Sequence, residues 1–190
     1  MSLLEPPPFA SFADLEREAL TCTKCPLAET RTQVVFGVGD AHADLLFVGE
    51  GPGEQEDLTG EPFVGRAGRL LTSLIEGIGL TRAQVYIANV VKCRPPGNRD
   101  PFPLEIESCW PYLDAQITFI EPRVVVTLGN FATKLRGREF PFRDHAVLIP
   151  ALHPSAVLRN GGPALAQARA DFVTIKRALA RSSGGSSGAS

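Results

Sequence analysis

The sequence predicts an α/β fold in which a short parallel sheet of about four strands lies between two layers of helices. Apolar runs typical of buried strands alternate along the 190 residues with segments whose apolar residues recur at helical spacing. Each long apolar run ends in a glycine or a polar residue, as strands do where they lead into loops. Strands that alternate with helices form a parallel sheet covered on both faces, which gives a three-layer α/β/α arrangement.

The first half of the chain contains the first of these alternations. Ser11 and Asp14 are suitable N-caps for a short amphipathic helix. The elements predicted in this half are a helix over 11–21, an edge strand over 33–36, a buried strand over 43–48, a helix over 70–78 and a second buried strand over 85–91.

The second half continues the alternation and ends in a polar tail. Predicted here are a helix over 104–120, a strand over 123–128 with a short helix after it, a strand over 146–149 and a last helix over 163–180. The Pro-rich residues 1–10 and the Gly/Ser-rich residues 182–190 are expected to be flexible. One domain should therefore span 11–181.

Composition excludes several classes of protein. The formal charge of −2 does not indicate a nucleic-acid-binding protein as a whole, so local patches would have to hold any phosphate backbone. The sequence has neither an apolar run long enough to span a membrane nor a basic-then-apolar leader. We therefore expect a cytoplasmic protein without membrane contact, whose four cysteines bind metal or do chemistry rather than form disulfides.

Polar residues at the ends of the predicted strands indicate a ligand site. In an open α/β sheet, ligands bind at the carboxyl ends of the strands, and the topology places Glu50, Asn89 and His153 there. Glu50 belongs to an acidic, glycine-broken segment over 49–57 that lacks the lysine and hydroxyl residue of a phosphate-binding loop. The alternative interpretation of this segment is a solvated turn.

Three side chains in unusual contexts have two interpretations each. Phe63 lies among turn-forming residues and is either a misplaced core residue or a platform for stacking. Asn89 interrupts an apolar run, and since a buried amide must be hydrogen-bonded, it either holds a loop or reads a ligand. His153 ends an apolar strand and precedes Pro154. This position favours a functional role for His153 over the alternative, a hydrogen-bonded histidine that takes no part in function.

The cysteines have the spacing of a four-sulfur site. Cys22 and Cys25 form a C-x2-C pair, and Cys93 and Cys109 follow much later. Four thiolates can hold zinc or an iron–sulfur cluster, and the lack of a second C-x2-C pair favours the cluster. The alternative is four unrelated buried thiols. A metal site here would be mainly structural, because it would pin the N-terminal helix to two distant segments.

In combination, these features resemble the uracil-DNA glycosylases of the fourth, iron–sulfur-containing family. The resemblance runs from about Cys22 to Leu179. It rests on Gly-Glu-Gly-Pro-Gly at 49–53 with Glu-Asp at 56–57, Pro-Phe-Val-Gly at 62–65, Asn-Val-Val-Lys-Cys-Arg-Pro-Pro at 89–96, Leu-Gly at 128–129, His-Pro-Ser at 153–155 and the four cysteines. It implies that a structural [4Fe-4S] cluster is held by Cys22, Cys25, Cys93 and Cys109.

The resemblance also implies the roles of the site residues. Glu50 would position or activate water, and His153 would hydrogen-bond O2 of uracil as charge builds there. The other implied uracil contacts are a pocket wall formed by Gly51 and Pro52, stacking on Phe63, recognition of N3–H and O4 by Asn89, and exclusion of the thymine methyl group by Glu56.

Contacts with DNA are implied around this pocket. Ser155 and the helix starts near Arg66 and near residues 129–130 would hold flanking phosphates. Arg94 is one of several arginines that either line a phosphate track or belong to a solvated arginine surface. The segment over 156–159 would fill the gap left by the flipped nucleotide, and the alternatives for the wedge are Val157, Leu158 and Arg159.

The implied activity is hydrolysis of the N-glycosidic bond of uracil flipped out of single- or double-stranded DNA by a monomer, with an abasic site and free uracil as products. Because Gly51 follows Glu50 and no histidine lies between Val91 and Pro101, we expect turnover. One relative in the superfamily instead traps uracil DNA covalently. Two alternatives stay open: a cluster-bearing DNA-binding module without catalysis, and a zinc-stabilised nucleotide-binding domain.

Overall fold

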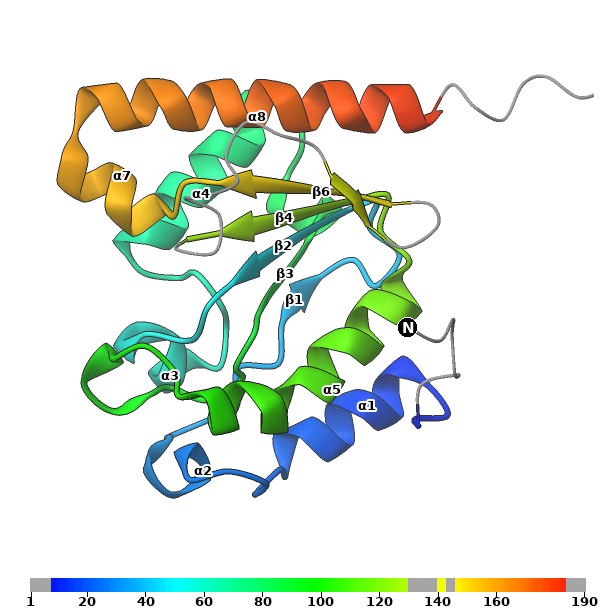
Figure 1. The fold of residues 1–190 in the computed structure, drawn as a ribbon, viewed down its shortest axis with the longest axis vertical. Coiled ribbons are helices and arrows are strands. Elements are labelled where there is room, and N and C mark those ends of the chain that lie inside the picture. The colour runs from blue at the N-terminus through cyan, green and yellow to red at the C-terminus, as the bar shows by residue number, and fades with distance from the viewer. Residues whose placement is uncertain (1–7, 130–139, 143–145, 184–190) are drawn as a thin grey trace, which may run out of the picture.

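The computed structural model describes residues 8–129, 140–142 and 146–183. They form three layers, in which one sheet lies between two layers of helices (Figure 1). The sheet has six strands in the order β1-β3-β2-β4-β6-β5. The strands are β1 (Val38–Gly39), β2 (Leu45–Gly49), β3 (Tyr86–Asn89), β4 (Val124–Leu128), β5 (Phe140–Phe142) and β6 (Ala146–Ala151). β2, β3, β4 and β6 run parallel, whereas β1 and β5 are antiparallel edges. The predicted parallel sheet of about four strands is therefore confirmed as the interior of this sheet.

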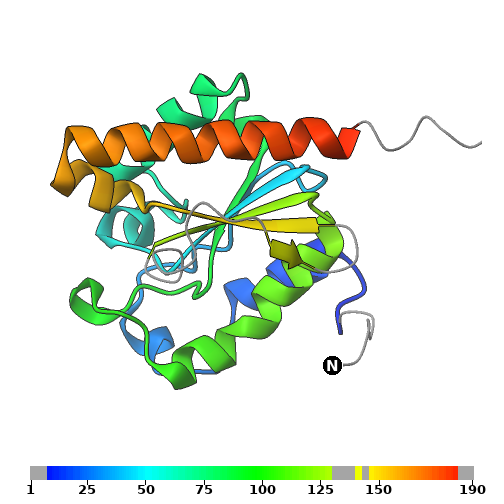
Figure 2. The ribbon, with the colours of Figure 1, turned by 45° about the horizontal axis from the view of Figure 1, so that its top comes forward.

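Helices cover both faces of the sheet. They are α1 (Phe12–Leu20), α2 (Leu27–Thr30), α3 (Glu54–Thr59), α4 (Arg66–Gly77), α5 (Pro103–Ile120), α7 (Pro154–Asn160) and α8 (Gly162–Ser183), with 3-10 helices η1 (Arg82–Gln84) and η2 (Pro96–Asn98). α4, α7 and α8 lie on one face, and α5 with α1 lies on the other (Figures 1 and 2). None of the helices in the described ranges combines the length and the apolar character that a membrane crossing requires.

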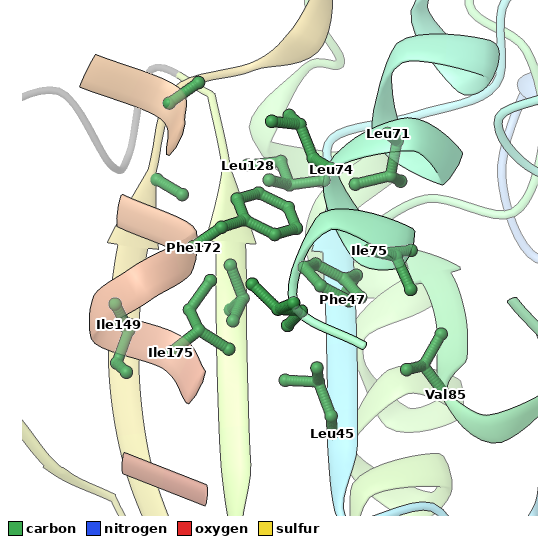
Figure 3. Packing of buried hydrophobic residues seen from close by; sticks show 14 of the residues in the cluster. Leu45, Phe47, Leu71, Leu74, Ile75, Val85, Leu128, Ile149, Phe172 and Ile175 are labelled. Atoms are coloured by element: carbon green, nitrogen blue, oxygen red, sulfur yellow. The ribbon is translucent and has the colours of Figure 1, made fainter. Parts of the chain in front are cut away.

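The central strand β2 buries both of its faces because successive side chains of a strand point in opposite directions. Phe47 packs toward α4 and α8, and its ring stacks on Phe172 with centroids 5.6 Å apart and planes inclined by 16° (Figure 3). Leu46 lies on the opposite face with Leu113 and Ile117 of α5. This double burial explains why the strand reads as a continuous apolar run in the sequence.

The predicted edge strand over 33–36 is wrong, because the strand at this edge is Val38–Gly39. Gly39 has φ +127°, and a Cβ on it would lie 1.9 Å from the carbonyl oxygen of Val85. Only glycine therefore allows the two backbones to approach at this point. The apolar residues over 34–36 contribute buried side chains instead.

Several helices differ from their predicted bounds. α4 begins at Arg66, where the resemblance implied a helix start, and four residues before the apolar pattern over 70–78. α3 lies in the acidic segment that was expected to be a loop, and α7 forms where no helix was predicted. The first turn of α3 carries three carboxylates, which the positive end of the helix dipole favours. α8 continues to Ser183, two residues into the predicted tail. The short helix predicted after the third long strand lies outside the described residues.

Candidate active site and cysteine centre

A cavity lies at the carboxyl ends of the parallel strands, and its lining includes residues of α3, α7 and the loop after β3. Figure 1 shows α3 and α7 at the end of the sheet toward which the parallel strands point. Its volume is about 1300 Å³, with the open mouth included. The structure brings nine of the predicted site residues into its lining: Glu50, Gly51, Pro52, Glu56, Phe63, Asn89, His153, Ser155 and Arg159. The strand ends that topology placed along one edge of the sheet therefore share one hollow.

Three residues predicted to contact DNA lie outside the cavity lining formed by the described residues. Arg66 is exposed at the first position of α4, and Leu158 is 42% exposed on α7. The Arg94 Nε donates to the Oδ1 of Asn98 at 2.7 Å. Arg66 and Leu158 are therefore on the surface, whereas Arg94 is half-buried.

Asn89 is the last residue of β3 and is only 2% exposed. Its register partner is Gly49, where a Cβ would lie 2.3 Å from the Oδ1 of Asn89 and 2.7 Å from the Cζ of Phe63. The glycine thus makes room for both side chains. Among the described residues, Oδ1 has no hydrogen-bond partner. A buried acceptor without a donor costs about 1–3 kcal/mol, so this atom is suited to a ligand that supplies an N–H group.

Phe63 has an unusual backbone conformation that its neighbours stabilise. Its φ of +55° is in the left-handed region, which residues other than glycine rarely adopt. The Glu56 Oε1 accepts the N–H groups of Val64 at 3.0 Å and Gly65 at 3.3 Å, and Oε2 accepts that of Gly53 at 3.1 Å. One carboxylate therefore ties the start of α3 to the turn that presents Phe63.

His153 precedes α7 as its N-cap residue. Its Nδ1 accepts the N–H of Ser155 at 3.1 Å, so the neutral ring carries its proton on Nε2 and donates from there. Burial, and then the positive charge of Arg159, lower the pKa of His153, against an opposing effect of Glu56. The ring at neutral pH is therefore an uncharged donor.

Glu50 follows β2 and is partly buried in the cavity. Burial raises the pKa of Glu50, and Asp100 raises it further through its charge and a side-chain hydrogen bond. Asp100 belongs to the loop after β3, which is clamped to α5 because Arg99 donates to both carboxylate oxygens of Glu105, at 2.8 and 2.6 Å. Sequence reasoning missed Asp100, and only the Pro-rich loop after a strand end could have indicated this region.

Asp57 shows that one part of the acidic segment has a different role. It is 3% exposed and accepts the N–H of Thr32 at 2.9 Å and that of Gln33 at 3.4 Å. These bonds join α3 to the segment before β1, outside the cavity lining. The carboxylate therefore contributes to the scaffold.

The four cysteines line one small cavity between the end of α1, the loop after β3 and α5. The Sγ of Cys109 accepts the main-chain N–H of Lys92 at 3.2 Å, and that of Cys93 accepts from Arg31 Nη1 at 3.3 Å. Burial raises the pKa of Cys93 to about 11 despite Arg31, so a thiolate there needs a bound cation. In the described ranges, no group of three or more His, Cys, Asp or Glu is placed to hold a metal ion. The Sγ of Cys22 also accepts a main-chain N–H, that of Lys24 at 3.5 Å. Four thiols around one cavity, three of them with donors at sulfur, are the donor set of a cysteine-ligated group.

Comparison with known proteins agrees with this geometry. The sequence pattern of the Uracil DNA glycosylase superfamily matches residues 36–179. The chain is 55% identical over 166 residues to the type-4 uracil-DNA glycosylase of Archaeoglobus fulgidus, and the alignment covers 78% of this chain and 83% of that protein. It is 50% identical over 151 residues to the type-4 uracil-DNA glycosylase of Thermotoga maritima, and this alignment covers 73% of this chain and 79% of that protein. The resemblance seen in the motifs is thereby confirmed: the chain belongs to the uracil-DNA glycosylase superfamily and, within it, to the type-4 family.

Proposed function

We propose that this protein excises uracil from DNA by hydrolysing the N-glycosidic bond, which leaves an abasic site and free uracil, as the first step of base excision repair. The observation that carries the proposal is one cavity lined by a carboxylate, an aromatic ring, an imidazole and an amide oxygen that no described residue hydrogen-bonds. They belong to Glu50, Phe63, Asn89 and His153. Membership of the type-4 family supports the same activity.

Asn89 would read the base. Its Oδ1, which has no partner in the part of the chain that the structure describes, accepts N3–H of uracil, and its amide N–H donates to O4. Cytosine presents the opposite pattern at this edge, so the same amide orientation rejects it. Phe63 would stack on the face of the base, and Glu56 would lie beside C5, where it excludes the methyl group of thymine.

His153 and Glu50 would act on the bond itself. Cleavage leaves negative charge on the base and positive charge on the sugar. The Nε2–H of His153 donates to O2 and stabilises the developing anion, as an oxyanion hole does. The Glu50 carboxylate, in a wall formed with Gly51 and Pro52, favours the sugar cation and orients the attacking water. With Gly51 after Glu50, we expect turnover.

The rim of the cavity would hold the DNA. Ser155 and Arg159 line the cavity from α7, and Arg66 and Arg94 are each next in sequence to a lining residue. All four suit contacts with flanking phosphates. The exposed Leu158 is an apolar candidate for the wedge that replaces the flipped nucleotide. We propose that a monomer acts on single- and double-stranded DNA.

Cys22, Cys25, Cys93 and Cys109 would hold a [4Fe-4S] cluster. Their common cavity and the N–H donors at sulfur support this assignment. When bound, the cluster cross-links the N-terminal helix, the loop after β3 and α5, which is a structural contribution. Four unpaired cysteines are also typical of a reducing compartment, for which we propose the cytoplasm, and we propose 11–181 as the glycosylase domain.

The test is excision of uracil from a labelled single-stranded oligonucleotide, read as strand breakage at abasic sites in alkali. The wild type should give abasic sites, and Glu50→Ala and His153→Ala should lose most of the activity. Glu54→Ala and His42→Ala are matched controls, because both residues are exposed outside the cavity lining. Iron-loaded protein that binds DNA without forming abasic sites would indicate a binding module. A colourless, zinc-loaded protein would support a zinc-stabilised nucleotide-binding domain.

A further inference from the structure

A buried lysine connects the cysteine centre to the amide proposed to read the base. Lys92 follows Asn89 by three residues and is 2% exposed. Its Nζ donates to the main-chain carbonyl of Asn89 at 2.8 Å and to the Oε1 of Gln116 at 2.5 Å. Its main-chain N–H donates to the Sγ of Cys109 at 3.2 Å. Lys92 also lines the cysteine cavity, so one residue contacts both sites.

The second acceptor of this lysine is itself fixed. Gln116 lies on α5 and is 0% exposed. Its Nε2 donates to the carbonyl of Phe36 at 2.9 Å and to the hydroxyl of Tyr86 at 3.4 Å. The Nζ of Lys92 therefore lies between a helix whose position is set by packing and the end of the strand that carries Asn89.

An ammonium group at this place has a physical cost. A methionine would fill similar space without the loss of hydration that burial imposes on a charged group. What the lysine provides is a donor to the Asn89 carbonyl, at the point where β3 ends. The direction of the Asn89 side chain depends on the backbone at that residue, and its Oδ1 has no partner among the described residues.

We propose that Lys92 is a positioning residue for uracil recognition. Its hydrogen bonds to α5 and to the cysteine centre hold the end of β3 in place, and the position of this strand end sets the direction of the Asn89 amide. The inference rests on the proposed function and extends it. It separates two properties of the protein: recognition of the base, which depends on Lys92, and binding of the DNA backbone, which does not.

The experiment compares Lys92→Met with the wild type at equal iron content per chain. One measurement is the single-turnover rate of uracil excision. The other is the affinity for the same oligonucleotide with a tetrahydrofuran in place of the deoxyuridine, which offers no base to Asn89. We expect excision to fall by about 10- to 100-fold, the range for a misplaced contact. We expect the affinity for the tetrahydrofuran oligonucleotide to change less than about twofold, within the scatter of distant substitutions.

Lys24→Met is the matched control. Lys24 also lines the cysteine cavity, but it is exposed and its Nζ donates to Glu18 Oε1 at 2.8 Å. This variant removes a positive charge from the same cavity without touching Asn89, and it should excise uracil at the wild-type rate. Gln116→Leu is the second variant, which removes one acceptor of Nζ and keeps the lysine. Its excision rate should also fall, but by less than that of Lys92→Met, while its affinity for the tetrahydrofuran oligonucleotide should stay near that of the wild type.

Two outcomes would overturn the inference. In the first, Lys92→Met excises uracil as fast as the wild type. In the second, excision and affinity for the tetrahydrofuran oligonucleotide fall together, which would make Lys92 a scaffold residue only. If Lys92→Met does not retain iron, Gln116→Leu decides by the same comparison. Excision by the wild type in the same series tests the proposed function separately.

Discussion

The ring of Phe63 lies 5.6 Å from that of His153, centroid to centroid, with the two planes inclined by 34°. Phe63 comes from the turn between α3 and α4, and His153 comes from the end of β6. They meet because β2 and β6 flank β4, so that the segments after both strands reach the same edge of the sheet. A stacking surface and an N–H donor thus lie side by side, which suits a planar base with a carbonyl at its edge.

The first prediction concerns the donor of His153. His153→Ala should lower the single-turnover excision rate by about 10²–10³, because the anion forming on the base loses its donor. His153→Gln keeps an N–H donor and should recover part of that rate. His42→Ala, at an exposed histidine, is the control. A His153→Ala protein close to the wild-type rate would show that the imidazole does not contact the base.

The second prediction concerns the pH dependence of Glu50. The carboxylate must be ionised to orient water, so activity should fall as pH drops through its raised pKa. Asp100→Asn removes a like charge, lowers the pKa of Glu50 and should move the acid limb of the pH–rate profile to lower pH. Glu54→Gln, at an exposed carboxylate of α3, should leave the limb in place. An unmoved limb in Asp100→Asn would exclude coupling between the two carboxylates.

The third prediction concerns base selection by Asn89. Asn89→Asp replaces an amide donor with a second acceptor, so it no longer satisfies O4 of uracil and instead accepts from N4 of cytosine. Excision of uracil should fall by about 10- to 100-fold, the equivalent of about 1–3 kcal/mol for an unmatched polar group. Cytosine should become a detectable substrate. Paired uracil and cytosine oligonucleotides measure both, and an unchanged preference would remove Asn89 from base recognition.

The fourth prediction concerns the turn that presents Phe63. Glu56→Gln replaces one acceptor oxygen with an amide that faces main-chain N–H donors. The loss should cost about 1–3 kcal/mol of unfolding free energy and lower Tm by several degrees. The KM for uracil oligonucleotides should rise as the ring of Phe63 shifts. Calorimetry compares the melting temperature of Glu56→Gln with that of the control Glu54→Gln. Equal melting temperatures would contradict the assigned hydrogen bonds.

The sequence by itself determined the layer order and the edge at which the site lies. Burial on both faces makes β2 an apolar run, and amphipathic burial gives α4 and α8 their helical spacing; both are local patterns. Polar residues at the ends of parallel strands must then lie on one edge, which is how Glu50, Asn89 and His153 could be singled out before their distances were known.

Local patterns did not predict the short elements around the site. β1 forms where Gly39 lets its backbone approach Val85, and α3 and α7 are shorter than the length at which propensity alone makes a helix stable. Their existence depends on contacts with distant parts of the chain. The motifs included parts of the segments that form α3 and α7, but they did not predict that these segments would be helical.

Only the tertiary structure decided which further side chains enter the site. Asp100 reaches Glu50 because Arg99 and Glu105 clamp the intervening loop, and Lys92 reaches both a strand end and α5. Hydrogen bonds and charge pairs act over a few ångströms between residues far apart in sequence. The path of the folded chain therefore determines which residues form these bonds, whereas hydrophobic periodicity is a property of each segment of the sequence alone.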